Sequence, residues 1–288
     1  MATTNATAPK SAPKAKKQSQ GFTGIKSGLA VIACCAVVAV CVYLFLFGEA
    51  SHFSNADATF SVFSDTDWEP VVGDLMGTVY KGGFIVPIIW TLLFTVLALS
   101  IERFFAIKTA YGKSSLAKFV ANIKAALVAN DLQRAKQLCD AQRGSVANVV
   151  GATLATYAEM EGNNDLTKEQ KVLAIQKSLE EATALEMPTM QENLPIIGTI
   201  VTLGTLTGLL GTVIGMIKSF SAMGGEGGAD SAALSTGISE ALVNTASGIA
   251  TSALAVIAYN YFTARIDKLT YSLDEVGFSI VQTFNATH

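Results

Sequence analysis

Charged residues are scarce in this chain of 288 residues. Asp, Glu, Lys and Arg make up only 15%, whereas soluble globular domains carry roughly 25%. Half of the residues are hydrophobic, and the mean hydropathy is +0.42. The net charge of −3 and the pI near 5.5 differ from the basic balance typical of nucleic-acid-binding proteins. The composition therefore favours a membrane protein and argues against a cytosolic enzyme or a nucleic-acid partner.

Histidine and cysteine are also too few for the usual reactive sites. His52 and His288 are the only histidines, so a His-based zinc site or a Ser-His-Asp triad has little to draw on. Three cysteines share one apolar run and the fourth stands alone: Cys34, Cys35, Cys41 and Cys139. This spacing fits neither a disulfide framework nor a metal site. We therefore expect no metal, no cofactor, no catalytic residue and no enzymatic activity.

Long apolar runs are what the chain does have. A transmembrane helix needs roughly 20 apolar residues, and four runs qualify: Leu29–Phe47, Gly82–Ile101, Leu194–Ile217 and Ser231–Ala264. The first run could also be a signal peptide, because Gly48-Glu49-Ala50 loosely resembles a cleavage site. Its apolar stretch is longer than the usual ~7–15 residues, which favours a retained helix. The sequence therefore predicts an all-α integral membrane protein with four transmembrane helices and a helical cytoplasmic domain.

The distribution of Lys and Arg sets the expected orientation. The tail 1–28 is basic and of low apolar content, which is typical of a disordered segment that can also contact anionic membrane lipids. Segment 48–81 is acidic, and segment 102–193 holds most of the remaining Lys and Arg. Both termini and the long middle segment are thus expected in the cytoplasm, and segments 48–81 and 218–230 on the other side.

The middle segment has a helical pattern. Apolar residues recur at helical spacing over Ala117–Val128, Leu132–Cys139 and Leu166–Met187. Thr167 and Gln170 form a capping-box pattern at the start of the last of these helices. Pro188 and Pro195 are expected to kink or restart the chain as it enters the bilayer.

The third apolar run is rich in small residues. Gly204 and Gly208 are four residues apart, as are Gly211 and Gly215, and this spacing lets helix backbones approach closely. We interpret these four glycines as packing residues. Three threonines lie on roughly one face of the same run: Thr202, Thr205 and Thr212.

The fourth run carries a polar stripe at spacings of four, three and four: Glu240, Asn244, Ser247 and Thr251. An ionisable residue in a membrane helix is costly and indicates a functional site, here a pore or a proton path. The alternative is that Glu240 lies near the helix start, close to interfacial water. Thr212 and Thr245 are each about 16 residues from the linker Gly224–Gly228, so an antiparallel pair would place them at similar depth. Glu240 would then lie roughly 7 Å nearer the outer side.

Two signatures give these runs a family resemblance. Gly208–Met216 resembles the Gly-Leu-x-Gly-Thr-Val-x-Gly signature of the MotA/TolQ/ExbB proton-channel family, and Gly237–Gly248 resembles its Gly-Ile-x-Glu-Ala-Leu-x-x-Thr-Ala-x-Gly signature. Glu102-Arg103 is similar to the pair that follows the family's first core helix, and Asp131–Cys139 is similar to its cytoplasmic helical repeat. The resemblance covers roughly residues 80–288 and is greatest to the ExbB branch.

The resemblance implies a subunit of a molecular motor in the bacterial inner membrane. ExbB-like subunits form a homopentamer around the membrane helices of an ExbD-like partner, which carries the protonatable Asp. Proton flow then energises TonB-dependent outer-membrane transport through a TonB-like protein. The family's pore threonines fall on Thr212 and Thr245, and its membrane Glu falls on Glu240. Thr205 stands where many relatives have Pro and adds a hydroxyl to the pore face. Asn244 of the polar stripe is also expected to line the pore.

Together these readings divide the chain into seven segments: a cytoplasmic tail (1–28), an extra transmembrane helix (29–47), a periplasmic segment (48–81), a transmembrane helix (82–107), a helical cytoplasmic domain (108–193), a pore-forming hairpin (194–264) and a cytoplasmic tail (265–288). Five alternatives remain open. Within the family, the chain could be a TolQ-like, gliding or MotA-like stator subunit. Outside it, a non-conducting membrane scaffold is the main alternative, and a secondary transporter would show inverted repeats that are not visible here.

Overall fold

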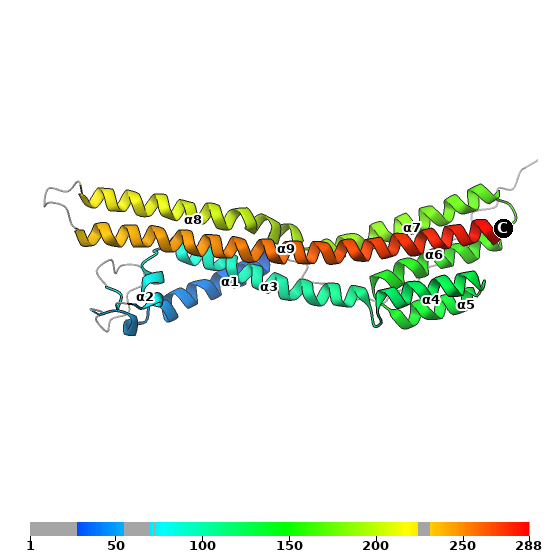
Figure 1. Ribbon diagram of the computed structural model, residues 1–288, viewed down its shortest axis with the longest axis horizontal. Coiled ribbons are helices and arrows are strands. Elements are labelled where there is room, and N and C mark those ends of the chain that lie inside the picture. Colours follow the sequence, from blue (N-terminus) through cyan, green and yellow to red (C-terminus); the bar gives the residue numbers. More distant parts are fainter. Residues whose placement is uncertain (1–27, 55–68, 72, 224–230, 288) are drawn as a thin grey trace, which may run out of the picture. The chain divides into compact units, whose positions relative to one another are not determined.

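The computed structural model describes residues 28–54, 69–71, 73–223 and 231–287 (Figure 1). In these ranges the chain is helical and has no strand, apart from one isolated bridge between Phe53 and Pro70. The all-α prediction is confirmed. The elements in chain order are α1 (Gly28–Cys41), the π-helix η1 (Val42–Phe47), the 3-10 helix η2 (Ala50–His52), α2 (Leu75–Tyr80), α3 (Ile85–Tyr111), α4 (Leu116–Val128), α5 (Leu132–Gln142), α6 (Ser145–Glu161), α7 (Lys168–Gln191), α8 (Leu194–Met223) and α9 (Ser231–Thr287).

Some sequence predictions lie outside the described residues. These are the tail 1–27, residues 55–68 and 72 of the acidic segment 48–81, and the glycine linker Gly224–Gly228.

Four helical stretches are long and apolar enough to cross a membrane: Gly28–Phe47, Ile85–Val128, Leu194–Ser221 and Leu234–Thr287. This confirms the prediction of four membrane-spanning helices. The last stretch differs in one respect, because α9 does not end near Ala264 but continues to Thr287 as one helix of 57 residues. The residues predicted as a C-terminal tail are therefore helical.

The chain forms two compact units, and the first contains residues 109–182 and 276–287. Its core consists of large apolar side chains on amphipathic helices. Tyr157 of α6 packs edge-on against Phe284 of α9 with the ring centroids 4.9 Å apart, within the usual range of about 4.5–7 Å for aromatic pairs. Both side chains are fully buried. Burial and the neighbouring Asp140 raise the pKa of the Cys139 thiol to about 12, so this cysteine is a small apolar core residue, as expected.

The predicted capping box is present at the start of α7. The backbone N–H of Thr167 donates to the side-chain oxygen of Gln170 (3.0 Å), and the N–H of Gln170 donates to the Thr167 hydroxyl (3.4 Å). Pro188 does not end the helix, since α7 continues to Gln191. The break falls at Asn193 instead, whose φ of 62° lies in the left-handed region.

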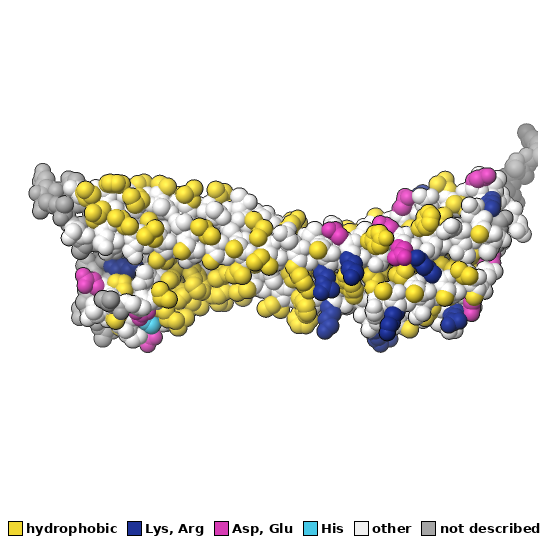
Figure 2. Space-filling model, in the orientation of Figure 1, with side chains coloured by type: hydrophobic (Ala, Val, Ile, Leu, Met, Phe, Trp, Pro, Cys, Tyr) yellow, Lys and Arg dark blue, Asp and Glu magenta, His cyan; other side chains and the backbone are white. Residues whose placement is uncertain are grey.

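The second unit contains residues 28–108 and 183–275 as far as they are described. Its α3, α8 and α9 share an apolar cluster of buried side chains: Val96, Leu99, Ile197, Ile200 and Ala255. Figure 2 shows apolar side chains covering the surface over α8 and over the α1–α3 region. Leu206 and Leu209 of α8 and Leu242 of α9 are among those that are more than half exposed. Such a surface suits contact with lipid or with other apolar helices.

The first membrane helix packs on the segment that follows it. Tyr43 of η1 stacks on Tyr80 of α2 and donates its hydroxyl to the Tyr80 carbonyl (3.0 Å). Nearby, His52 Nδ1 lies 2.6 Å from Asp74 Oδ2, and Asp74 caps α2 by accepting from the N–H of Met76. The hydrogen bond with His52 lowers the pKa of Asp74 below its ordinary value.

Candidate functional site

The contact between α8 and α9 is made backbone to backbone. The two helices run antiparallel and side by side (Figure 1). A Cβ at Gly248 of α9 would lie 2.6 Å from the carbonyl oxygen of Gly204 and 2.8 Å from Cα of Gly208. Gly211 and Gly215 are equally enclosed by α9, at Asn244 and at Gly237. The four glycines named from the sequence thus all lie against α9, where no side chain would fit without moving the helices apart.

Thr212 and Thr245 meet at the centre of this contact. Their hydroxyls hydrogen-bond to each other, and both also lie within bonding distance of the Gly208 carbonyl, at 3.2 and 3.4 Å. Thr245 has a further acceptor in the Ala241 carbonyl (3.1 Å). The two hydroxyls carry two protons between them and share more acceptors than that. They can therefore reorient between acceptors, as a chain of hydroxyls must do to pass a proton.

Further hydroxyls line the contact between α8 and α9 toward the start of α8. Thr205 of α8 donates to the hydroxyl of Ser252 on α9 (2.8 Å). Thr251 donates to the carbonyl of Ser247 on its own helix (2.9 Å), which is the ordinary way for a threonine in a membrane helix to satisfy its hydroxyl. The Thr205 hydroxyl thus joins the two helices, whereas the Thr251 hydroxyl bonds within α9.

Glu240 lies at the other end of the contact, in an ion pair. Lys218 Nζ of α8 is 2.8 Å and 3.1 Å from the two Glu240 carboxylate oxygens. The Glu240 side chain is 7% exposed and that of Lys218 is 52% exposed. Gly83, in the turn before α3, has a φ of 72°, and a Cβ there would lie 2.6 Å from Glu240 Oε1. Three elements therefore enclose this carboxylate.

Asn244 lies one helical turn from Glu240, between the ion pair and the threonines. Its side-chain N–H donates to the Gly82 carbonyl (3.0 Å), and the residue is fully buried. Its Oδ1 accepts no hydrogen bond from any residue that the structure describes. A buried acceptor without a donor costs about 1–3 kcal/mol, so an unpaired amide oxygen here marks a place where a donor such as water would be stabilised.

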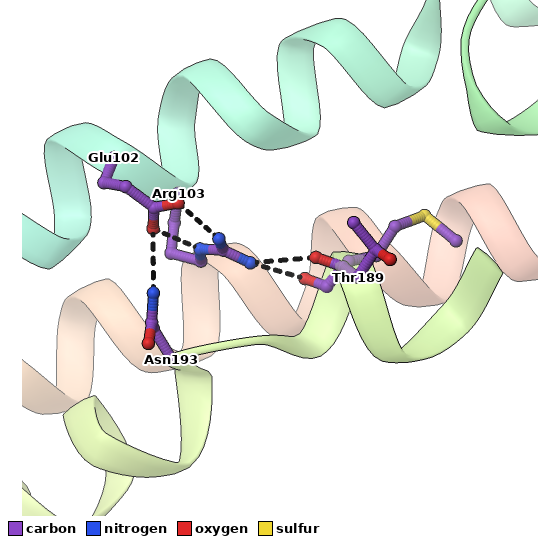
Figure 3. A network of polar contacts seen from close by, with 5 residues as sticks. Glu102, Arg103, Thr189 and Asn193 are labelled. Atoms are coloured by element: carbon purple, nitrogen blue, oxygen red, sulfur yellow. Dashed lines mark hydrogen bonds and ion pairs between the residues drawn. The ribbon is translucent and has the colours of Figure 1, made fainter. Parts of the chain in front are cut away.

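A second polar network lies at the junction of α7 and α8 (Figure 3). The fully buried Arg103 of α3 pairs with Glu102 and donates to the carbonyls of Thr189 (3.1 Å) and Met190 (3.4 Å). Asn193 Nδ2 donates to Glu102 at 3.5 Å. The carbonyls at the end of α7 thereby gain donors, and the left-handed turn at Asn193 is tied to α3. This network holds the start of α8 in place.

Lys218 was not among the residues predicted from the sequence. The antiparallel register that places Thr212 beside Thr245 would have found it, because extending this register by less than two turns brings Lys218 to Glu240. The Gly82-Gly83 turn has no comparable signal in the sequence. Among the described residues, no group of three His, Cys, Asp or Glu side chains could hold a metal ion.

Comparison with known proteins identifies the region that holds this site. Residues 148–275, from α6 to α9, match the model of the MotA/TolQ/ExbB proton channel family. The chain is 38% identical over 87 residues to a putative biopolymer transport protein ExbB-like 3 of Synechocystis, covering 30% of this chain and 41% of that protein. It is 35% identical over 95 residues to the Tol-Pal system protein TolQ of Pseudomonas aeruginosa (33% and 41%).

A third relative is the biopolymer transport protein ExbB of Helicobacter pylori, which is 36% identical over 94 residues (33% of this chain and 64% of that protein). The matched parts therefore span less than two thirds of the length of each of these relatives. With its four apolar helices, the chain is a multi-pass membrane protein, and its residues 148–275 are similar to the MotA/TolQ/ExbB proton channel family.

Proposed function

We propose that this chain is an ExbB-like proton-channel subunit of a motor driven by the proton-motive force. The observation that carries the proposal is the half-buried hydroxyl pair of Thr212 and Thr245 between α8 and α9, five residues along α9 from the buried Glu240. These exchangeable groups lie on helices that are otherwise apolar. The membrane potential can supply the energy for such a motor, because one charge that moves through 100 mV releases about 2.3 kcal/mol.

The same proposal assigns partners and location. Five copies form a ring in the bacterial inner membrane around an ExbD-like subunit whose carboxylate accepts the proton, and a TonB-like protein receives the work. Both chain termini and residues 108–193 lie in the cytoplasm, and segment 48–81 lies in the periplasm. The exposed apolar side chains of α8 and α9, such as Leu209 and Leu242, support contacts between subunits and with lipid.

A TolQ-like role is the second candidate, because a TolQ protein matches this chain about as well as the ExbB relatives do. Both roles use the same pathway and differ in the process that they energise. A gliding or MotA-like stator role would require a charged cytoplasmic surface that contacts a rotor. A non-conducting scaffold would use the same helices for assembly alone.

The test is co-purification with an ExbD-like membrane protein from the same genome, followed by native mass spectrometry in detergent. The expected result is a ring of defined stoichiometry that retains the partner. A stable oligomer that never retains such a partner would contradict the motor function and favour the non-conducting scaffold. Deleting that partner and measuring TonB-dependent uptake and outer-membrane integrity separates the ExbB-like from the TolQ-like role.

A further inference from the structure

We propose that Lys218 is a displaceable counter-charge that controls access to Glu240. While the ammonium is bound, the Glu240 carboxylate is held against the Gly83 turn and is closed to the outer side. When the ammonium leaves, Glu240 can take a proton from outside. This inference rests on the proposed function, because it assigns the entry step of the same pathway.

The two partners of this ion pair differ in exposure. Glu240 is enclosed by α8, α9 and the turn before α3, whereas half of the Lys218 side chain is open. The lysine side chain has a flexible four-carbon stem, so its ammonium can move into water while the Glu240 carboxylate remains in its buried position. Leaving Glu240 charged and unpaired in this position would be costly. Departure of Lys218 is therefore coupled to the arrival of a proton on Glu240.

The charge balance of this step is complete. A hydronium ion gives its proton to the Glu240 carboxylate and becomes water. Lys218 keeps its three protons and exchanges the carboxylate for hydration.

The turn before α3 completes the closure. Gly83 has no side chain and presses its backbone to within contact of Glu240, and the Gly82 carbonyl accepts from Asn244. Asn244 Oδ1, which no described residue satisfies, lies one turn further in. A proton on Glu240 would thus have an acceptor next to it on the way to Thr212 and Thr245.

Chemical labelling of Glu240 tests this role without relying on transport. Dicyclohexylcarbodiimide adds a protonated carboxyl group across its C=N bond, and the product rearranges to a stable N-acylurea. The full-length protein in liposomes is treated with this reagent, and the modified fraction at Glu240 is measured by peptide mass spectrometry. The variants are Lys218→Met, Lys218→Arg and, as a matched surface control, Lys177→Met, whose ion pair with Glu181 is exposed.

We expect Lys218→Met to raise labelling at Glu240 about tenfold, because hydrogen bonds to a charged group are among the stronger ones. Lys218→Arg and Lys177→Met should label as the wild type does, and Glu240→Gln serves as the blank. Equal labelling in the Met, Arg and wild-type proteins overturns the proposal. If Lys218→Met does not accumulate in membranes, Lys218→Gln is judged by the same criterion. If the wild-type protein shows no proton flux but the variants label as expected, the result counts against the proposed function alone.

Discussion

The contact between α8 and α9 and the core of the unit formed by residues 109–182 and 276–287 are built from opposite kinds of side chain. In the first, glycines bring backbones together, and hydroxyls bond across the gap. In the second, Tyr157 and Phe284 fill the space between helices. In lipid, apolar helices gain no hydrophobic free energy by associating, so close packing and hydrogen bonds hold them together. In water, the hydrophobic effect drives large apolar surfaces together.

This difference explains how the membrane unit accommodates a polar stripe. Close backbone contact between α8 and α9 lets the Thr212 and Thr245 hydroxyls bond to each other across the two helices, and Asn244 is fully buried in the same contact. A core of large side chains would leave no room for such a bond. The substitutions below are expected to show that the two regions fail in different ways.

The largest effect is expected from Arg103→Met. This change leaves Glu102 as a buried charge without its partner and frees the carbonyls of Thr189 and Met190. Breaking a buried pair from one side costs about 3–5 kcal/mol. Unfolding in detergent mixtures measures the loss, and Lys108→Met, at an exposed position of the same helix, is the control. A cost equal to that of the control would contradict the role given to this network.

Phe284→Ala tests the core of the other unit. Removing a fully buried aromatic ring costs about 3–5 kcal/mol through lost burial and the cavity left behind. Hydrogen exchange should speed up at the buried amides of α6, around Tyr157. The exposed Asn285→Ala serves for comparison and should leave exchange unchanged. Unaltered protection in Phe284→Ala would mean that this ring is not part of the core.

A glycine-to-alanine substitution made once in each region compares the two kinds of packing directly. Gly248→Ala places a Cβ within 2.8 Å of two backbone atoms of α8, and we expect it to destabilise the protein by about 1–3 kcal/mol. Gly151→Ala in α6 meets only one atom, at 3.8 Å, and should stabilise by roughly 0.5–1 kcal/mol through helix propensity. Effects of the same sign at both sites would refute the distinction drawn here.

Thr245→Val should change stability by only about 0.6 kcal/mol, the average for a hydrogen bond between membrane helices. The side chains have nearly the same shape, so packing is retained. A double-mutant cycle with Thr212→Val measures the coupling. A coupling of zero would show that the two hydroxyls do not interact in the membrane.

The smallest effect concerns acid and the segment after the first membrane helix. The pKa of Asp74 is lowered in the folded chain, so its contribution is present at neutral pH and is lost as the pH falls below about 4. Protection of the Met76 amide against hydrogen exchange should fall over that range in the wild type. In Asp74→Asn the amide oxygen can still accept from the Met76 N–H, so the protection should be retained and be independent of pH. A fall of the same size in the variant would assign it to another group.

The sequence predicted what depends on local pattern. Uncharged runs gave the four membrane helices, and Thr167 with Gln170 gave the start of α7. The helix α6 was missed because its small and β-branched residues, as in Ser145–Gly151, carry little helical contrast. Pro188 was expected to kink or restart the helix, but the chain turns at Asn193, because Arg103 of α3 holds the last carbonyls of α7 and Glu102 accepts from Asn193.

The site divides in the same way. Spacing along one helix identified Glu240, Asn244 and the glycines of α8, and symmetry about the linker brought Thr212 to Thr245. The partners of Glu240 lie on other elements. The same register would have identified Lys218 of α8, whereas no sequence pattern indicates Gly83 before α3.

Proton flux into liposomes that contain the chain and its ExbD-like partner tests the central claim most directly. Thr245→Val should lower the flux at least about tenfold, as a barrier higher by about 1.4 kcal/mol would do. Thr199→Val should leave the flux unchanged, because the Thr199 hydroxyl is exposed and donates only to the Pro195 carbonyl of its own helix. Equal flux in the wild type and in Thr245→Val would contradict a pathway through the Thr212–Thr245 pair.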